Sequence, residues 1–147
     1  MTSRHPLEQQ LGVQFRAQDL LKQALTHSSY VNENPWWQQE SNQRLEFLGD
    51  ALLGLVVAEE LFRRCPGRSE GELTYLRSYV VTDQSLARVA QELGLGQHLL
   101  MGKGEESLGG RERPSNLAGA LEALAAGLFL DQGFDAARST LLKVLDK

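Results

Sequence analysis

Two long segments of the chain are almost entirely apolar, and each is interrupted only by carboxylates. Between Leu45 and Val57 the only charged residues are Glu46 and Asp50, and between Asn116 and Leu130 the only one is Glu122. On a helix, residues four apart lie on one side, so Glu46 and Asp50 share a face. Helices that are apolar all round are buried. We therefore expect the two segments to pack against each other in the core of an all-α protein.

The isolated acids predict a cation site. Desolvated carboxylates at close range repel each other, so either their pKa values rise or a cation lies between them. Oxygen ligands favour Mg²⁺, with Mn²⁺ as a substitute, and such ions suit phosphoryl-transfer chemistry. Two other interpretations stay open: Glu46 and Asp50 form a solvated helix edge, or Glu122 pairs with Arg44 or Arg77.

Apolar spacing and capping residues predict the remaining helices. Ser69 and Glu72 have the spacing of a capping box, and Thr82 and Ser115 can each cap a helix. The glycine-rich stretch 94–114 is expected to be an irregular, functional loop. No segment shows the alternation typical of a strand. The predicted helices cover residues 18–30, 42–64, 70–80, 83–93, 116–131 and 135–146.

Length and composition narrow the class of protein further. The chain of 147 residues fits one domain over residues 1–147. A net charge of -4 argues against a purely electrostatic nucleic-acid binder, so cations would have to help bind a polyanion. The N-terminus lacks a secretory signal, no apolar run could span a bilayer, and no glycine-rich nucleotide loop precedes a helix. A cytoplasmic protein without a membrane or nucleotide partner is expected.

Two arginines lie just before the second acid-bearing segment. Arg111 and Arg113 follow a Gly-Gly pair and precede the predicted start of the helix that carries Glu122. Guanidinium groups beside a helix N-terminus can bind phosphate. An ordinary solvated loop is an equally good interpretation of these residues alone.

The segment "NQRLEFLGDALL" resembles the signature of the ribonuclease III catalytic domain, usually Asn-Glu-Arg-Leu-Glu-Phe-Leu-Gly-Asp. The resemblance continues through "SEGELTYLRSYVV", "LARVAQELGLGQHLLMGKGEESLGGRERPSNLA" and "LEALAAGLFLDQG", in the family's order and over nearly the whole chain. It implies an all-helical endonuclease domain that forms a homodimer and cleaves double-stranded RNA with Mg²⁺, in RNA processing such as that of ribosomal RNA. The products would carry 5′-phosphate and 3′-hydroxyl ends.

The resemblance also assigns roles by position. Glu46 and Glu122 match metal ligands, and Asp50 matches the catalytic aspartate beside them, so Asp50 and Glu122 are the expected catalytic pair. Many members carry a separate double-stranded-RNA-binding domain after this one. The sequence ends at Lys147 without one, which predicts weaker and more salt-sensitive RNA binding.

Other matched positions concern the partner subunit and the RNA. Phe47 matches the signature aromatic that packs into the partner subunit, and Glu70 matches an acidic position near the catalytic valley. Arg111, Arg113 and Ser115 fall in a segment that the family places close to bound RNA.

Two positions depart from the family pattern. Gln43 stands where the signature usually has Glu, and "AGALEAL" puts Gly119 where the family's Ala-Asp-x-x-Glu-Ala-Leu has another metal-binding aspartate. Two interpretations of Gly119 stay open: it allows close packing between helices, or it leaves the metal site without one ligand. The alternative to an active nuclease is therefore a catalytically impaired dimer that serves as an RNA-binding or scaffold module.

Overall fold

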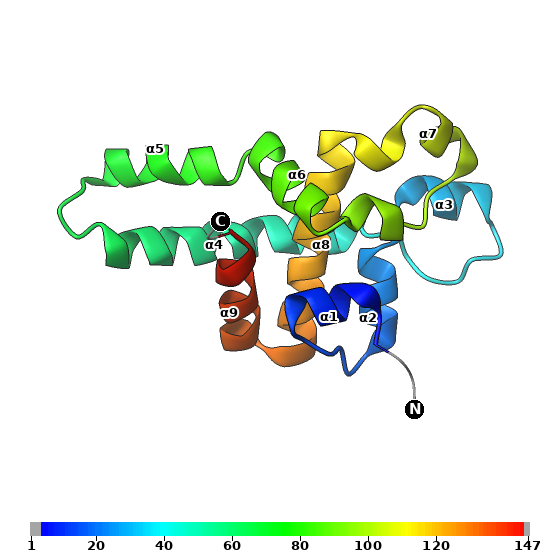
Figure 1. Ribbon diagram of the computed structural model, residues 1–147, viewed down its shortest axis with the longest axis horizontal. Helices are drawn as coiled ribbons and strands as arrows, with labels where there is room; N and C mark the ends of the chain where they lie inside the picture. The colour runs from blue at the N-terminus through cyan, green and yellow to red at the C-terminus, as the bar shows by residue number, and fades with distance from the viewer. Residues whose placement is uncertain (1–3, 146–147) are drawn as a thin grey trace.

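The computed structural model describes residues 4–145, and these are mostly helical (Figure 1). The only β-structure among them is an isolated bridge between Thr26 and Leu100. The all-α prediction is therefore confirmed. The elements in chain order are α1 (Pro6–Leu11), α2 (Gln18–Ala24), α3 (Ser28–Glu33), α4 (Gln43–Arg64), α5 (Glu70–Val80), α6 (Asp83–Glu92), the 3₁₀ turn η1 (Leu95–His98), α7 (Lys103–Ser107), the 3₁₀ turn η2 (Gly110–Glu112), α8 (Pro114–Gln132) and α9 (Phe134–Leu145).

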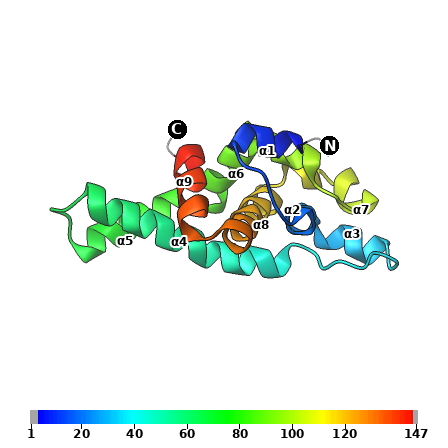
Figure 2. The ribbon, with the colours of Figure 1, turned by 90° about the horizontal axis from the view of Figure 1, so that it is seen from below.

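Helix α8 is the centre of the fold. All its residues from Leu117 to Leu128 are buried, Glu122 among them. Helices α4, α6, α2 and α9 all pack against it, and Figures 1 and 2 show them around it. This position explains why its sequence is apolar on every side, because no face of the helix meets solvent. The predicted packing of the two acid-bearing segments is confirmed, since α4 crosses α8 in close contact.

Helices α4 and α5 form an antiparallel hairpin that extends beyond the rest of the molecule (Figures 1 and 2). The first half of α4 lies against α8, and the second half runs out with α5. Ser69 caps α5, since its hydroxyl accepts a hydrogen bond from the Glu72 amide at 3.2 Å. Thr82 caps α6 in the same way, accepting from the Ser85 amide at 3.1 Å. Both predicted caps are confirmed.

The predicted helix over residues 18–30 is wrong, because it is broken into α2 and α3. At the break, the Leu100 amide donates to the Leu25 carbonyl at 2.8 Å and the His27 amide donates to the Leu100 carbonyl at 2.9 Å. These bonds to a distant segment replace helical bonds around Thr26, which is fully buried. Apolar spacing continues through the break and therefore could not reveal it.

Three further differences from the prediction concern the start of α8, the stretch 94–114 and helix α1. Helix α8 begins at Pro114, and its N-cap is Arg113 without a side-chain bond, so the predicted capping by Ser115 is wrong. The stretch 94–114 contains α7 and both 3₁₀ turns instead of being wholly irregular. Helix α1 was not predicted, and the Asp146 end of the last predicted helix lies outside the described residues.

No helix in the described part of the chain is long and apolar enough to cross a membrane.

Candidate active site at the crossing of α4 and α8

The isolated acids of α4 and α8 meet in one open pocket of about 500 Å³. Helix α4 contributes four residues and α8 contributes one. The junction between α5 and α6 contributes two, Val81 and the first residue of α6, Asp83. Glu122 is 7% exposed, so its carboxyl is buried at the floor, whereas Asp50 is exposed. The lining residues are Gln43, Glu46, Phe47, Asp50, Val81, Asp83 and Glu122.

A glycine brings the two helices close enough to form this pocket. A Cβ atom at Gly49 would overlap the backbone carbonyl of Glu122 on α8. Any larger residue would therefore push α4 away from α8 at the level of the acids. Because Asp50 follows Gly49 directly and Glu46 lies one turn before it, this contact carries both acids toward Glu122.

The acids destabilise each other's charged forms. Burial raises the pKa of Glu122 to about 8, helped by a hydrogen bond with Asp50 and by the charges of Asp50, Glu46 and Asp83. Burial likewise raises the pKa of Glu46, with further contributions from Asp83 and then Asp50, while His27 opposes them. Near neutral pH the protonated Glu122 carboxyl can donate its hydrogen bond to Asp50. The pocket thus holds more negative charge than the surrounding protein neutralises.

No arginine neutralises Glu122 in the described residues. Arg44 pairs instead with Glu40 at 3.2 Å on the exposed side of α4. Arg77 lines a different pocket, between α4 and α5. The interpretation of Glu122 as a member of an ion pair with either arginine is therefore wrong. The solvated-edge interpretation fits the exposure of Asp50 but not the partial burial of Glu46.

Arg111 and Arg113 are both engaged inside the segment between α6 and α8. Arg111 donates to the carbonyls of Gly96 and Leu99 at 2.9 and 2.7 Å and pairs with Glu106 at 2.9 Å. Arg113 pairs with Glu105 at 2.6 Å. The two guanidinium groups therefore brace this segment, which is neither of the arrangements considered from the sequence. Ser115 is exposed at the start of α8.

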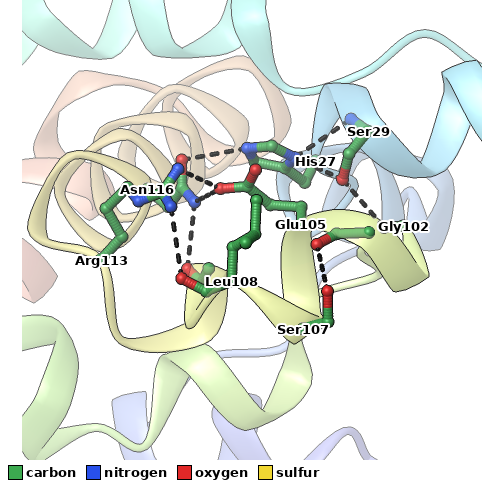
Figure 3. Close-up of polar contacts among 10 residues, drawn as sticks. His27, Ser29, Gly102, Glu105, Ser107, Leu108, Arg113 and Asn116 are labelled. Atoms are coloured by element: carbon green, nitrogen blue, oxygen red, sulfur yellow. Dashed lines mark hydrogen bonds and ion pairs between the residues drawn. The ribbon is translucent and has the colours of Figure 1, made fainter.

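A polar network holds the braced segment against the start of α8 (Figure 3). Glu105 accepts from both Arg113 and Asn116, the latter at 3.0 Å. The Asn116 side-chain oxygen lies 3.0 Å from Nε2 of His27, and Nδ1 of His27 accepts from the Ser29 amide at 3.1 Å. Since Nδ1 is an acceptor, Nε2 carries the proton and donates to Asn116. The network ties α3, α7 and α8 together next to the acidic pocket.

The other two expected site residues, Phe47 and Glu70, lie on α4 and α5. Phe47 is 82% exposed at the pocket, so nothing in the described chain covers its ring. Glu70 lines a separate cavity of about 440 Å³ between α4 and α5, together with Arg68 and Arg77. The structure therefore brings together Glu46, Asp50, Glu122 and Phe47, but not Glu70.

Comparison with known proteins shows to which family the chain belongs. Residues 17–147 match the Ribonuclease-III-like family. The chain belongs to the ribonuclease III family. It is 54% identical over 139 residues to Ribonuclease 3 of Pelotomaculum thermopropionicum, covering 95% of this chain and 58% of that protein. Ribonuclease 3 of Dehalococcoides mccartyi is 49% identical over 138 residues, with 94% and 58% covered. The chain thus spans less than two thirds of the length of these relatives.

A solved structure extends the likeness to the fold. The nuclease domain of ribonuclease III from Campylobacter jejuni superposes with a TM-score of 0.90 and 42% sequence identity, covering 97% of this chain and 95% of that one. That structure is described as showing flexibility in a region involved in dimer formation. The predicted ribonuclease III nuclease-domain fold is confirmed.

Gly119 lies against the Glu46 side chain of the acidic pocket. A Cβ atom at this position would lie 2.8 Å from Oε2 of Glu46 and 3.1 Å from Oε1. The Glu46 carboxylate therefore lies in the space that a side chain at position 119 would need. Among residues 4–145, no three acidic, histidine or cysteine side chains are already arranged to hold one metal ion. The donor set nevertheless fits in chemistry, because carboxylate oxygens on rotatable side chains are what Mg²⁺ and Mn²⁺ prefer.

Sequence reasoning missed one acid of the pocket, Asp83. It was predicted only as the first residue after the Thr82 cap, with no relation to the acids of α4 and α8. The cap indicates where α6 begins, but it does not indicate which neighbour the first turn of α6 faces. That depends on how the hairpin returns to α8, which is a tertiary property.

Proposed function

We propose that this chain is the nuclease domain of an endoribonuclease that cleaves double-stranded RNA with the help of a divalent cation. The cation is Mg²⁺, with Mn²⁺ as a substitute, and the products carry 5′-phosphate and 3′-hydroxyl ends. The observation that carries the proposal is the buried Glu122 facing Glu46 and Asp50, without a basic partner in the described chain. Membership of the ribonuclease III family supports RNA cleavage as the reaction at this acidic pocket.

The acids of the pocket have different proposed roles. Glu46, Asp50 and Glu122 would hold the cation, which when bound activates water and neutralises the phosphate. Asp50, the exposed member, faces the open side of the pocket where water and the scissile phosphate would enter. The buried Glu122 provides a carboxylate whose ionisation becomes favourable once positive charge is present. Asp50 and Glu122 are the proposed catalytic residues.

The domain is proposed to work as a homodimer. The α4–α5 hairpin exposes several large apolar side chains, and we infer that they belong to a protein interface. The Phe47 ring lines the acidic pocket of its own subunit, and from there it would insert into the partner subunit. The exposed apolar residues of the hairpin are Phe47, Leu55, Phe62, Tyr75 and Tyr79.

RNA contact is assigned to the segment around Arg111, Arg113 and Ser115. Because the arginines are bound to Glu105 and Glu106, their main effect would be to fix the backbone that faces RNA. We further propose a cytoplasmic role in RNA processing, including that of ribosomal RNA. Residues 1–147 would form a single nuclease domain.

Cleavage of a long double-stranded RNA tests the proposal. The purified chain is incubated at low salt with Mg²⁺, with Mn²⁺ and with chelator, and Glu122→Gln is assayed in parallel. We expect metal-dependent cutting that falls at least about 100-fold in the variant, because a buried ligand is lost. Cutting that persists in chelator would contradict the proposed mechanism.

A second candidate function is a dimeric RNA-binding scaffold that no longer cleaves. The observation that favours it is Gly119, where the Glu46 side chain takes up the space of a missing acid. The variant Gly119→Asp separates the two candidates. Binding without cutting in the unsubstituted chain, together with cutting in Gly119→Asp, would identify the scaffold.

A further inference from the structure

Asp83 belongs to the acidic pocket although it comes from a third element of the fold. It is the first residue of α6 and lines the pocket together with Glu46 and Glu122. The Thr82 cap fixes where α6 starts, so it holds Asp83 at this edge of the pocket. Three separate helices thus bring carboxylates to one place.

Asp83 has no counter-charge that would give it a structural role. Within the described chain it forms no ion pair, and its position in the first turn of α6 gives only the general stabilisation of an acid at a helix N-terminus. That stabilisation would be the same if Asp83 faced away from the pocket.

The floor of the pocket points independently to a missing positive ligand. Glu122 is 7% exposed and lines the pocket, and among residues 4–145 the side chain hydrogen-bonded to its carboxyl is that of another acid, Asp50. A buried carboxyl in this position is costly unless something compensates it. A cation that replaced the proton between Glu122 and Asp50 would enter from the pocket, which Asp83 also lines.

Gly119 explains why an additional acid is needed there. The Glu46 carboxylate lies beside Gly119, with Oε2 2.8 Å from the position of a Cβ atom. Helix α8 therefore offers one carboxylate to the pocket, and Glu46 leans toward the place where a second could stand. An acid from a third helix, Asp83 at the start of α6, restores the number of carboxylates around the pocket.

We propose that Asp83 is a metal-site carboxylate of this chain, binding the divalent cation from the α6 side in place of the acid that position 119 lacks. This inference rests on the proposed function, because it requires the pocket to bind a divalent cation. Contact through an ordered water is included, since Mg²⁺ commonly keeps several waters.

Calorimetric titration with Mn²⁺, in the absence of RNA, tests the inference directly. The unsubstituted chain is compared with Asp83→Asn, with Asp83→Glu, and with the matched control Asp135→Asn. Asp135 is also an acid in the first turn of a helix, α9, but it does not line the pocket. We expect Asp83→Asn to weaken Mn²⁺ binding about tenfold or more, Asp83→Glu to keep most of the affinity, and Asp135→Asn to change nothing.

The outcomes separate this inference from the proposed function. Mn²⁺ binding by the unsubstituted chain that is equally tight in Asp83→Asn would overturn the role of Asp83 and leave the proposed function standing. Equal losses in Asp83→Asn and Asp135→Asn would also overturn it, because they would indicate a general charge effect. Failure of the unsubstituted chain to bind Mn²⁺ would overturn both. Asp83 is exposed, and thermal unfolding of each variant checks that the fold is retained.

A double-mutant cycle tests the replacement of position 119 itself. If Asp83 substitutes for an acid at that position, the cost of Asp83→Asn should shrink to less than about threefold in a Gly119→Asp background. An identical cost in both backgrounds would show that the two positions act independently, and the replacement would be refuted.

Discussion

Glu105, which contacts the start of helix α8, and Glu122, which lies on α8, are both acids with little exposure to solvent, but their surroundings are opposite. Glu105 accepts hydrogen bonds from Arg113 at 2.6 Å and Asn116 at 3.0 Å (Figure 3). Glu122, less than two turns beyond Asn116, meets only other acids, and its pKa rises to about 8. One carboxylate is neutralised by the fold and stabilises it. The other has no basic partner in the described chain, so its protonated form is favoured, and a strongly shifted pKa of this kind is typical of a functional site.

The largest expected effect comes from forcing the two helices apart at the acidic pocket. Gly49→Ala places a methyl group against the Glu122 carbonyl, so we expect a loss of about 3 kcal/mol or more in the free energy of unfolding. Urea unfolding measures it, and nuclease activity should be lost in the same variant. Gly54→Ala is the matched control, since a Cβ atom there would meet no atom within 4 Å among the described residues. Equal stability of the two variants would contradict the close helix crossing.

The second prediction concerns pH. Glu122 keeps its proton up to about pH 8 in the folded chain but only to about pH 4.5 when unfolded. Between these values the folded chain binds more protons than the unfolded chain, so its free energy of unfolding falls as the pH rises. We expect a loss of up to about 3 kcal/mol from pH 5 to pH 8 without metal, measured by urea unfolding. The slope should flatten in Glu122→Gln; an unchanged slope there would assign it to other groups.

The third prediction compares the two glutamates directly at neutral pH without metal. Glu105→Ala removes the partner of Arg113 and Asn116, so it should lower the free energy of unfolding by about 2 kcal/mol. Glu122→Gln should raise it, because a poorly solvated acid is replaced by a neutral amide. Thermal unfolding gives the sign for both variants. If both destabilise the chain, the contrast drawn between the paired and the unpaired acid is wrong.

The smallest expected effect is at the rim of the acidic pocket. Gln43→Glu adds a negative charge next to Glu46, and Gln43 is exposed, so solvent screens the charge. We expect a loss of less than about 0.5 kcal/mol in metal-free stability at low salt, and none in high salt. Mn²⁺ titration of the same variant should show slightly tighter binding. A salt-independent loss of stability would point to disturbed packing instead of charge.

The sequence by itself determined the helical class, the positions of α4, α5, α6 and α8, and the approach of Glu46 and Asp50 to Glu122. These features depend on local spacing, on the Ser69 and Thr82 caps, and on the apolar residues of two helices, of which α8 is buried from Leu117 to Leu128 and α4 is buried on one face. Only the tertiary structure decided the break at Thr26, the internal pairing of Arg111 and Arg113, and the place of Asp83. Each of these depends on a partner distant along the chain, and spacing within one helix carries no information about which distant group will lie beside it.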